Sequence, residues 1–452
     1  MLGISRFRIV LIGSVLLAVL GARPYASSWN DGSRLANVEA LVDQHTWAID
    51  KSIFVDVPRQ HELDPYSHDV PSIGGTMDKL FINGHFYSDK PPVATLYLAG
   101  VYWIAHKLTG LTAAQDPHIF VYLLTLASSS VAFVVGVCCI WSLALRLGLS
   151  EQSSFIVTAS LALATVAPIY ARQVNNSIVE LAVFAVIFVL ACAEKQRPAL
   201  FGFLIGLAYT LDLGIGPVLV IAALIYGCIK WRSLQSLALC AAGMVPLMAV
   251  HHWFNYQITG MIGPPGANVA FLDYPGSAFS ADNITGVWSH HSVWTLIQYA
   301  MEMLIGQHGF LLYNLPLLLI PVGVAGLWRA FPQWRTELLF AALVSAGSWM
   351  VYALGSNNFS GSSTSIRWFV PLLIPAYFAL ILMLRARPGL LYQFRILSAF
   401  GFMLTFSLYW FGPFRIVNLL LFWPIVALAL GTLIWTLWRP QNVSTLELPA
   451  SS

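Results

Sequence analysis

Long apolar stretches recur along almost the whole chain, and most of the polar segments between them are short. The 452 residues are 58% hydrophobic and only 10% charged, with a mean hydropathy of +0.72, whereas soluble domains carry about 25% charged residues. In lipid every backbone polar group must find a partner within the protein, and a helix meets this need by itself. The chain is therefore predicted to be an all-α polytopic membrane protein.

About twelve segments approach the roughly 20 apolar residues that a helix needs to cross a bilayer. They are centred in 8–25, 119–143, 154–171, 178–193, 199–211, 213–229, 234–252, 309–328, 338–354, 368–384, 396–411 and 416–437. The stretch 93–108 is also apolar, and whether it crosses decides on which side every later loop lies.

The distribution of lysine and arginine indicates the orientation. If 93–108 does not cross, the short loops on the side of the N-terminus hold Arg146, Lys195, Arg197, Lys230, Arg232, Arg329, Arg335, Arg385, Arg387 and Arg395. The positive-inside rule then predicts that both termini are cytoplasmic, in a plasma membrane or bacterial inner membrane. The stretch 93–108 becomes an interfacial helix at the membrane surface.

This topology predicts one integral-membrane domain, 1–440, followed by a polar cytoplasmic tail at 441–452. Two large loops, 26–117 and 253–308, lie outside the cytoplasm and hold most of the acidic residues, so any chemistry is expected there. The sequence contains no G-x-x-x-x-G-K-[ST] phosphate loop. Its basic residues form no stripe or face, which argues against nucleic acid as a partner.

The first outer loop begins with Asn-Asp-Gly-Ser-Arg at 30–34, directly after the first apolar helix. Asp31 is expected at the membrane edge, where partial desolvation raises the pKa of a carboxylate and makes it a better proton acceptor at neutral pH. An alternative is that this cluster caps a helix over 34–44, because Asp and Asn satisfy free N–H groups at a helix start.

The same loop ends with Gly-His-Phe-Tyr-Ser-Asp-Lys-Pro-Pro at 84–92. The two prolines restrict the backbone, so Lys90 is expected to hold its ammonium rigidly at the level of lipid phosphates. The alternative is a lysine that only reaches toward lipid head groups. His85 and Tyr87 could donate hydrogen bonds to a sugar or a diphosphate, although an interfacial aromatic belt explains Tyr87 equally well.

Arg367 follows a loop rich in Gly, Ser and Asn at 355–365. An arginine there can hold a phosphate through two parallel N–H contacts, or it can anchor the end of the next helix. Glu180 and Asp212 are ionisable residues within apolar surroundings, but both also suit helix starts. The paired histidines at 251–252 and 290–291 lack the i, i+4 spacing of a metal site, so no metal ligand is predicted.

Taken in order, these motifs resemble the GT-C superfamily of polytopic glycosyltransferases, in particular the protein O-mannosyltransferases and the aminoarabinose transferases. Members share an acidic motif after the first membrane helix, a Y-x-x-K-P-P motif at the end of the first outer loop, and an outer Asp or Asn motif between the third and fourth spans. This chain offers 30–34, 87–92, Asn-Asn-Ser at 175–177, a re-entrant type of segment at 309–316, and 361–367.

The resemblance implies a glycosyltransferase of the hexosyl or pentosyl class that acts outside the cytoplasm. It would move a sugar from a polyprenyl-phosphate donor to a lipid, glycan or protein acceptor. In this role Asp31 is the general base, and Lys90 and Arg367 hold the leaving phosphate. The further substrate-binding residues that it implies are Arg34, His85, Tyr87, Asp89 and Asn176.

Two departures from the family pattern affect the predicted chemistry. Gly32 stands where related enzymes often have a second acid, and the motif at 175–177 contains no Asp. Asp31 is therefore predicted to be the only well-placed acid, which weakens the case for a divalent metal without excluding one. With no second carboxylate to act as a covalent nucleophile, a single displacement with inversion at the anomeric carbon is expected. The main alternative function is a flippase for lipid-linked sugars or another secondary transporter.

Overall fold

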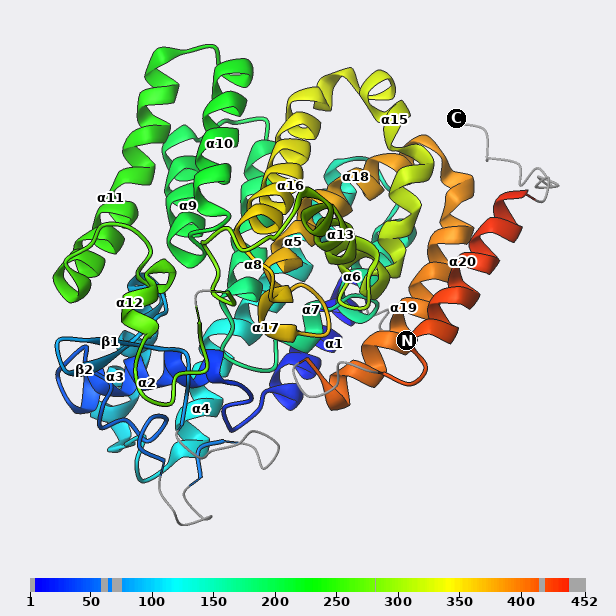
Figure 1. Ribbon diagram of the computed structural model, residues 1–452. Coiled ribbons are helices and arrows are strands. Elements are labelled where there is room, and N and C mark those ends of the chain that lie inside the picture. Colours follow the sequence, from blue (N-terminus) through cyan, green and yellow to red (C-terminus); the bar gives the residue numbers. More distant parts are fainter. Residues whose placement is uncertain (1–4, 58–63, 67–74, 281, 414–418, 439–452) are drawn as a thin grey trace.

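The computed structural model describes residues 5–57, 64–66, 75–280, 282–413 and 419–438. Its long helices run side by side in one bundle, and a smaller group of elements gathers at one end of it (Figure 1). We call this smaller group the cap; it comprises α2, α3, β1, β2 and α12. The predicted tail at 441–452 lies outside the described residues.

The helices of the bundle are α1 (Arg6–Gly21), α4 (Pro117–Thr125), α5 (Val131–Arg146), α6 (Glu151–Leu163), α7 (Ala167–Tyr170), α8 (Asn176–Ala191), α9 (Pro198–Leu211), α10 (Gly216–Lys230), α11 (Leu234–Thr259), α15 (Ile320–Ala330), α16 (Arg335–Gly355), α18 (Leu373–Ala386), α19 (Leu391–Phe411) and α20 (Phe422–Trp438). The cap and the remaining short helices are α2 (Trp29–Asp43), β1 (Lys79–Ile82), β2 (His85–Ser88), α3 (Pro92–Thr109), α12 (Val269–Leu272), α13 (Val293–Ile305), α14 (Phe310–Tyr313) and α17 (Phe359–Ser362).

Each of the predicted apolar segments coincides at least in part with one or more of these helices. Within the described residues, five helices are long and apolar enough to cross a membrane: Pro117–Arg146, Leu234–Thr259, Pro332–Gly355, Arg367–Ala386 and Pro388–Phe411. Four further apolar helices, α8, α9, α10 and α20, are shorter. The chain is thus a mostly helical, multi-pass membrane protein.

The segment 309–328 differs from the straight span that its hydropathy predicts. Val293–Tyr313 and Leu315–Ala330 form a pair bent by 110°, and the break falls between α14 and the turn that contains Pro316. Asn314 stabilises the break from inside, because its side chain donates to the carbonyl of Phe310 at 2.7 Å and accepts from the N–H of Val166 at 3.0 Å. A proline and a satisfied polar side chain therefore replace the helix interior expected here.

Helices α9 and α11 pack backbone to backbone through small residues. A side chain at Gly202 or Gly206 would collide with the carbonyls of Cys240 and Met244, and one at Gly243 would collide with that of Ala199. Small residues four apart are typical of helix pairs that associate in lipid by close van der Waals contact. This pairing fixes the position of the α9–α10 junction, which forms part of the site below.

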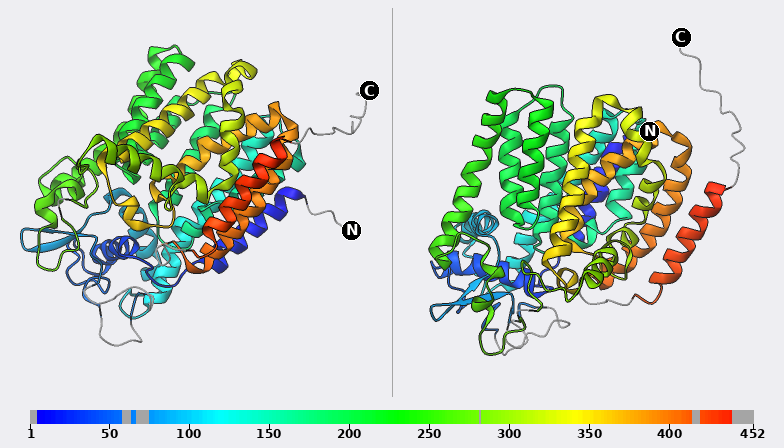
Figure 2. Two further views of the ribbon diagram at one scale, coloured as in Figure 1. Left: turned by 45° about the vertical axis from the view of Figure 1, so that its right-hand side comes forward. Right: turned by 45° about the horizontal axis from the view of Figure 1, so that its top comes forward.

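The first outer loop builds its own apolar core. Its buried residues include Leu35 and Val38 of α2, Tyr102 of α3, and Phe54 from the segment between α2 and β1. Helix α3 begins after Pro91, as predicted, and does not reach the apolarity of a membrane span. In the right-hand view of Figure 2 it is seen nearly end-on, across the direction of α9, α10 and α11. The cap is therefore a small packed unit rather than a loose loop.

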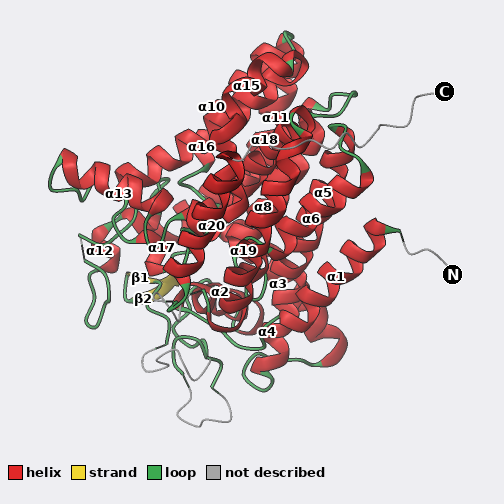
Figure 3. Ribbon diagram, turned by 90° about the vertical axis from the view of Figure 1, so that its right-hand side faces the viewer, coloured by secondary structure: helices red, strands yellow, loops and turns green. Residues whose placement is uncertain are grey.

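Among the described residues one two-stranded sheet forms, the hairpin of β1 and β2, which is drawn in yellow in Figure 3. Asn83 and Gly84 both have positive φ, 51° and 86°, as the commonest tight hairpin turn requires. The turn pairs Lys79 with Ser88 across the two strands. Asp78 consequently lies beside Asp89 in space, although a short sequence motif around Lys90 would not include it.

Candidate active site

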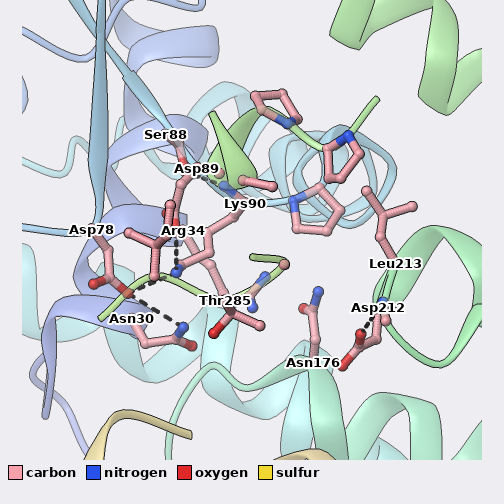
Figure 4. Close-up of a pocket in the computed structure, with 18 of the residues that line it drawn as sticks. Asn30, Arg34, Asp78, Ser88, Asp89, Lys90, Asn176, Asp212, Leu213 and Thr285 are labelled. Carbon is pink, nitrogen blue, oxygen red and sulfur yellow. Dashed lines mark hydrogen bonds and ion pairs between the residues drawn. The ribbon is translucent and has the colours of Figure 1, made fainter. Parts of the chain in front are cut away.

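A cavity of about 460 Å³ lies where the cap meets the bundle (Figure 4), within the range of roughly 300–1,000 Å³ typical of small-molecule sites. Its walls come from α2, the residues after β2, the start of α8, the α9–α10 junction, the second outer loop and 367–368. The charged side chains that line it are Arg34, Lys90, Arg367, Asp78, Asp89 and Asp212.

Lys90 is held between two carboxylates. Its Nζ donates to Asp78 Oδ2 at 2.7 Å and to Asp89 Oδ2 at 2.8 Å, and its side chain is only 8% exposed. The backbone N–H of Lys90 donates to Ser88 Oγ at 3.2 Å. These contacts satisfy the ammonium within the protein, so a phosphate must compete with two aspartates for it.

The two aspartates beside Lys90 have opposite pKa shifts. Burial alone would raise the pKa of Asp78, but the charge and hydrogen bond of Lys90 outweigh it and hold that pKa below its ordinary value. Burial raises the pKa of Asp89; Lys90 opposes this shift, and the charge of Asp78 adds to it. Asp89 is thus the better proton acceptor of the pair near neutral pH.

Arg34 lies on the face of α2 that lines the cavity. The residue is 9% exposed, and within the described residues its guanidinium has no hydrogen-bond partner, with Nε fully buried. Burial lowers the pKa of Arg34 to about 10, Asp89 counteracts the shift, and the charge of Arg367 adds to it. Because a buried, unpaired charge is costly, this arrangement is suited to an anion bound in the cavity.

Arg367 lines the same cavity and comes from a segment that is far from α2 in the sequence. Its backbone N–H donates to Ser360 Oγ at 3.0 Å. The preceding loop is sharply curled, with positive φ at Phe359, Ser360 and Gly361 of 47°, 59° and 77°. Strained backbone of this kind persists only where the surroundings enforce it. The Gly/Ser-rich loop that precedes Arg367 is therefore held in a defined, tightly turned conformation beside the cavity.

Asp31 takes up a different position from the one predicted. Helix α2 begins at Trp29, not near residue 34, and its N-cap is Ser28. The carboxylate of Asp31 accepts from Ser27 N–H at 2.6 Å and from Ser28 Oγ–H at 2.5 Å, it is 1% exposed, and it does not line the cavity. Burial raises the pKa of Asp31, and these hydrogen bonds oppose the shift. The helix-start interpretation of the cluster fits this geometry, with the helix itself placed earlier.

The other predicted substrate-binding residues divide into two groups. Tyr87, Asp89 and Asn176 line the cavity together with Arg34. His85 does not: its ring is well exposed and its Nδ1 lies 3.2 Å from Asp50 Oδ2. His85 and Tyr87 share one face of β2, so the difference lies in their position along the strand: His85 is next to the hairpin turn and pairs with Ile82, whereas Tyr87 pairs with Leu80.

The prediction that Asp31 is the only well-placed acid is wrong. Asp78, Asp89 and Asp212 all line the cavity. Asp78 was missed because only the hairpin register brings it to Lys90, and the Asn-Gly pair at 83–84 was the available signal for that hairpin. Within the described residues, no three His, Cys, Asp or Glu side chains lie close enough to hold a metal ion together.

Glu39 predicts a pH dependence of stability. Its buried carboxylate accepts from Ser52 Oγ–H at 2.5 Å and Ile53 N–H at 3.2 Å, and burial raises its pKa from 4.5 to about 7 despite these bonds. The fold favours the protonated form, so its contribution is full below pH 4.5 and is lost as the pH rises through about 7. At roughly 1.4 kcal/mol per pKa unit, the loss is at most about 3.5 kcal/mol.

The Glu39→Gln variant should remove this slope. We expect the unfolding temperature of the wild type to decrease as the pH rises from 4.5 to about 7, the interval between the two pKa values of Glu39, and that of the variant to decrease less steeply. Thermal unfolding in detergent measures both. An equal slope in the two proteins would contradict the assignment to Glu39.

Comparison with known proteins gives a fold match but no sequence match. No family model and no curated protein matches the chain. ArnT from Cupriavidus metallidurans, solved bound to undecaprenyl phosphate, aligns at a TM-score of 0.50 and 14% identity over 94% of this chain and 75% of that one. The oligosaccharyltransferase of Archaeoglobus fulgidus aligns at 0.45 and 12% over 94% and 55%. Both neighbours are GT-C glycosyltransferases, and the first match establishes the fold.

Proposed function

We propose, for a chain with the fold of the GT-C glycosyltransferases, that it transfers a sugar from a polyprenyl-phosphate donor to an acceptor outside the cytoplasm. The observation that carries the proposal is the cavity in which the buried, unpaired Arg34 lies near Arg367 and beside the acids Asp78 and Asp89. The ArnT neighbour was solved with undecaprenyl phosphate, which supports a lipid phosphate as the anion.

In this proposal the phosphate is held chiefly by Arg34 and Arg367. A guanidinium binds phosphate oxygens through two parallel N–H donors, and fixed positive charge stabilises the phosphate as it leaves. Two arginines that repel each other across a cavity gain most from an anion between them. Lys90 becomes available to the phosphate once Asp78 or Asp89, the two carboxylates that bind it, is protonated.

We propose Asp89 as the base that takes the proton of the acceptor. Proton transfer to Asp89 removes one of the two negative charges that hold Lys90, which leaves the ammonium more available for the departing phosphate. Base and leaving-group stabilisation are then coupled through one lysine. The sequence-based assignment of the base to Asp31 stays a prediction, and the variants Asp31→Asn and Asp89→Asn separate the two.

Membrane placement is part of the proposal. Twelve crossings with both termini cytoplasmic, 93–108 as an interfacial helix and the cavity outside a bacterial inner membrane are supported by the distribution of lysine and arginine and by α3 lying across the bundle. Single cysteines near residues 50 and 110 should both react with an impermeant reagent added outside. Protection of the second alone would mean that α3 crosses.

Purified protein in detergent should transfer sugar from a polyprenyl-phosphate donor to a suitable acceptor. Lys90→Ala should lower the rate at saturating donor, because it removes the cation coupled to Asp89, and NMR of the product should show an inverted anomeric centre. Because three carboxylates line the cavity, a retained anomeric centre would indicate a covalent intermediate on one of them. Movement of the donor across liposomes without transfer would favour the transporter alternative.

A further inference from the structure

The junction between α9 and α10 presents a fixed carboxylate to the cavity. Asp212 Oδ1 accepts from the N–H groups of Gly214 at 2.8 Å and Ile215 at 3.4 Å, and from the O–H of Tyr352 at 2.5 Å. Asp212 is the C-cap residue of α9 and its side chain bonds the turn at 214–215, whereas α10 begins at Gly216 with Ile215 as its N-cap. All these contacts use one oxygen, and in the part of the chain that the structure describes Oδ2 makes no hydrogen bond.

The residues behind Asp212 make this wall rigid. The ring of Tyr352 stacks on Trp368 with centroids 4.2 Å apart and planes 3° from parallel. A side chain at Gly214 would collide with the same ring, so the glycine is what lets the tyrosine reach Asp212. A carboxylate positioned in this way loses little entropy when it binds a ligand.

Asn176 adds a second acceptor to the same wall. Its Nδ2 donates to the carbonyl of Leu211 at 3.0 Å, which assigns the amide orientation because a carbonyl can only accept. Its Oδ1 has no partner among the described residues, and Asn176 lines the cavity. Asp212 Oδ2 and Asn176 Oδ1 therefore offer only acceptors, and Figure 4 shows the two side chains near each other.

Two of the cations that line the cavity thus lie apart from the two open acceptors. Arg34 and Lys90 lie on one side of Figure 4, and Asn176 and Asp212 on the other. A ligand that fits both sides carries a negative charge at one end and at least two hydrogen-bond donors at the other. A sugar phosphate has this pattern, since its ring donates through hydroxyls or a protonated amine.

We propose that Asp212 and Asn176 accept hydrogen bonds from two adjacent groups on the sugar ring of the lipid-linked substrate, and so decide which sugars the enzyme accepts. This rests on the proposed function, because it takes the lipid phosphate to be bound at Arg34. Asp212 is a specificity-determining residue here and takes no part in the displacement. Sugar hydroxyls and a protonated sugar amine would both be recognised in this way, and polyprenyl-phosphate sugars of each kind distinguish the two.

The test compares the affinity for a polyprenyl-phosphate sugar with that for bare polyprenyl phosphate. Asp212→Asn keeps an oxygen for Gly214 and Tyr352 but turns the open acceptor into an N–H donor. We expect it to weaken binding of the sugar-bearing donor by about 10- to 100-fold, the range for hydrogen bonds to a charged group, and to leave bare polyprenyl phosphate unaffected. A larger loss with an amino sugar than with its hydroxyl counterpart would identify the amine as the preferred group.

Two further variants keep the result interpretable. Tyr352→Phe removes a bond to Oδ1 only, so the ratio of the two affinities should stay as in the wild type. Asn176→Ala should lower the ratio in the same direction as Asp212→Asn, even if the latter fails to fold. Equal losses for both ligands, or none for the sugar-bearing one in either variant, overturn the inference. Failure of the wild type to bind either lipid overturns the proposed function as well.

Discussion

Replacing Arg34 with glutamine should lower kcat/KM for the lipid-linked donor by about 10²–10³-fold, the effect of removing one preorganised donor from a developing anion. Arg34 is buried, and in the described part of the chain nothing else uses its guanidinium. Binding of bare polyprenyl phosphate should weaken in parallel, because Arg34 is one of the two residues that we propose to hold the phosphate. Donor titrations and single-turnover transfer measure the two effects.

The same variant should be no less stable than the wild type. A buried cation without a partner opposes folding, and its replacement by a neutral side chain of similar length removes that cost. Arg34→Lys keeps the charge but not the two-pronged geometry, so it should recover only part of the activity. Arg395→Gln removes an exposed arginine and should change neither activity nor the unfolding midpoint. A strongly destabilised Arg34→Gln would instead assign the arginine to structure.

The sequence alone was sufficient for the helical membrane class and for most of the polar segments that form the cavity. Hydropathy places the apolar helices because each depends mainly on its own residues. The GT-C resemblance grouped Lys90, Arg34 and Asn176 because their motifs occur in the family order, and the three side chains line one cavity. These predictions depend on local composition and on order along the chain.

What the sequence did not reveal depends on contacts between distant segments. Asp78 reaches Lys90 only through the hairpin register, and Asp212 becomes an open acceptor only because Tyr352 and the turn at 214–215 occupy its other oxygen. The direction of Asp31 depends on a helix that starts at Trp29, and a shift of a few residues turns a side chain to another face. Hydropathy alone does not reveal the break at Asn314, which is stabilised by Val166, whereas the GT-C resemblance predicted a re-entrant segment at 309–316.

The last prediction decides which carboxylate is the base. Asp89→Asn should lower kcat by about 10²–10⁴-fold, the usual contribution of general base catalysis, with an unfolding midpoint close to that of the wild type. The base must be deprotonated to act, so wild-type activity should rise with pH through the raised pKa of Asp89. In the variant the residual activity should lose this acidic limb.

Asp31→Asn should behave in the opposite way. Its carboxylate accepts the N–H of Ser27 and the O–H of Ser28 at the start of α2, so its loss should cost about 1–2 kcal/mol of stability, as for other helix caps. The folded fraction should keep most of its kcat and its acidic limb. Ser28→Ala is the matched control, because it removes one of these bonds and leaves the carboxylate, and it should reproduce part of the destabilisation. A folded Asp31→Asn protein without activity, beside an active Asp89→Asn protein, would return the base to Asp31 and require α2 to turn toward the cavity when substrates bind.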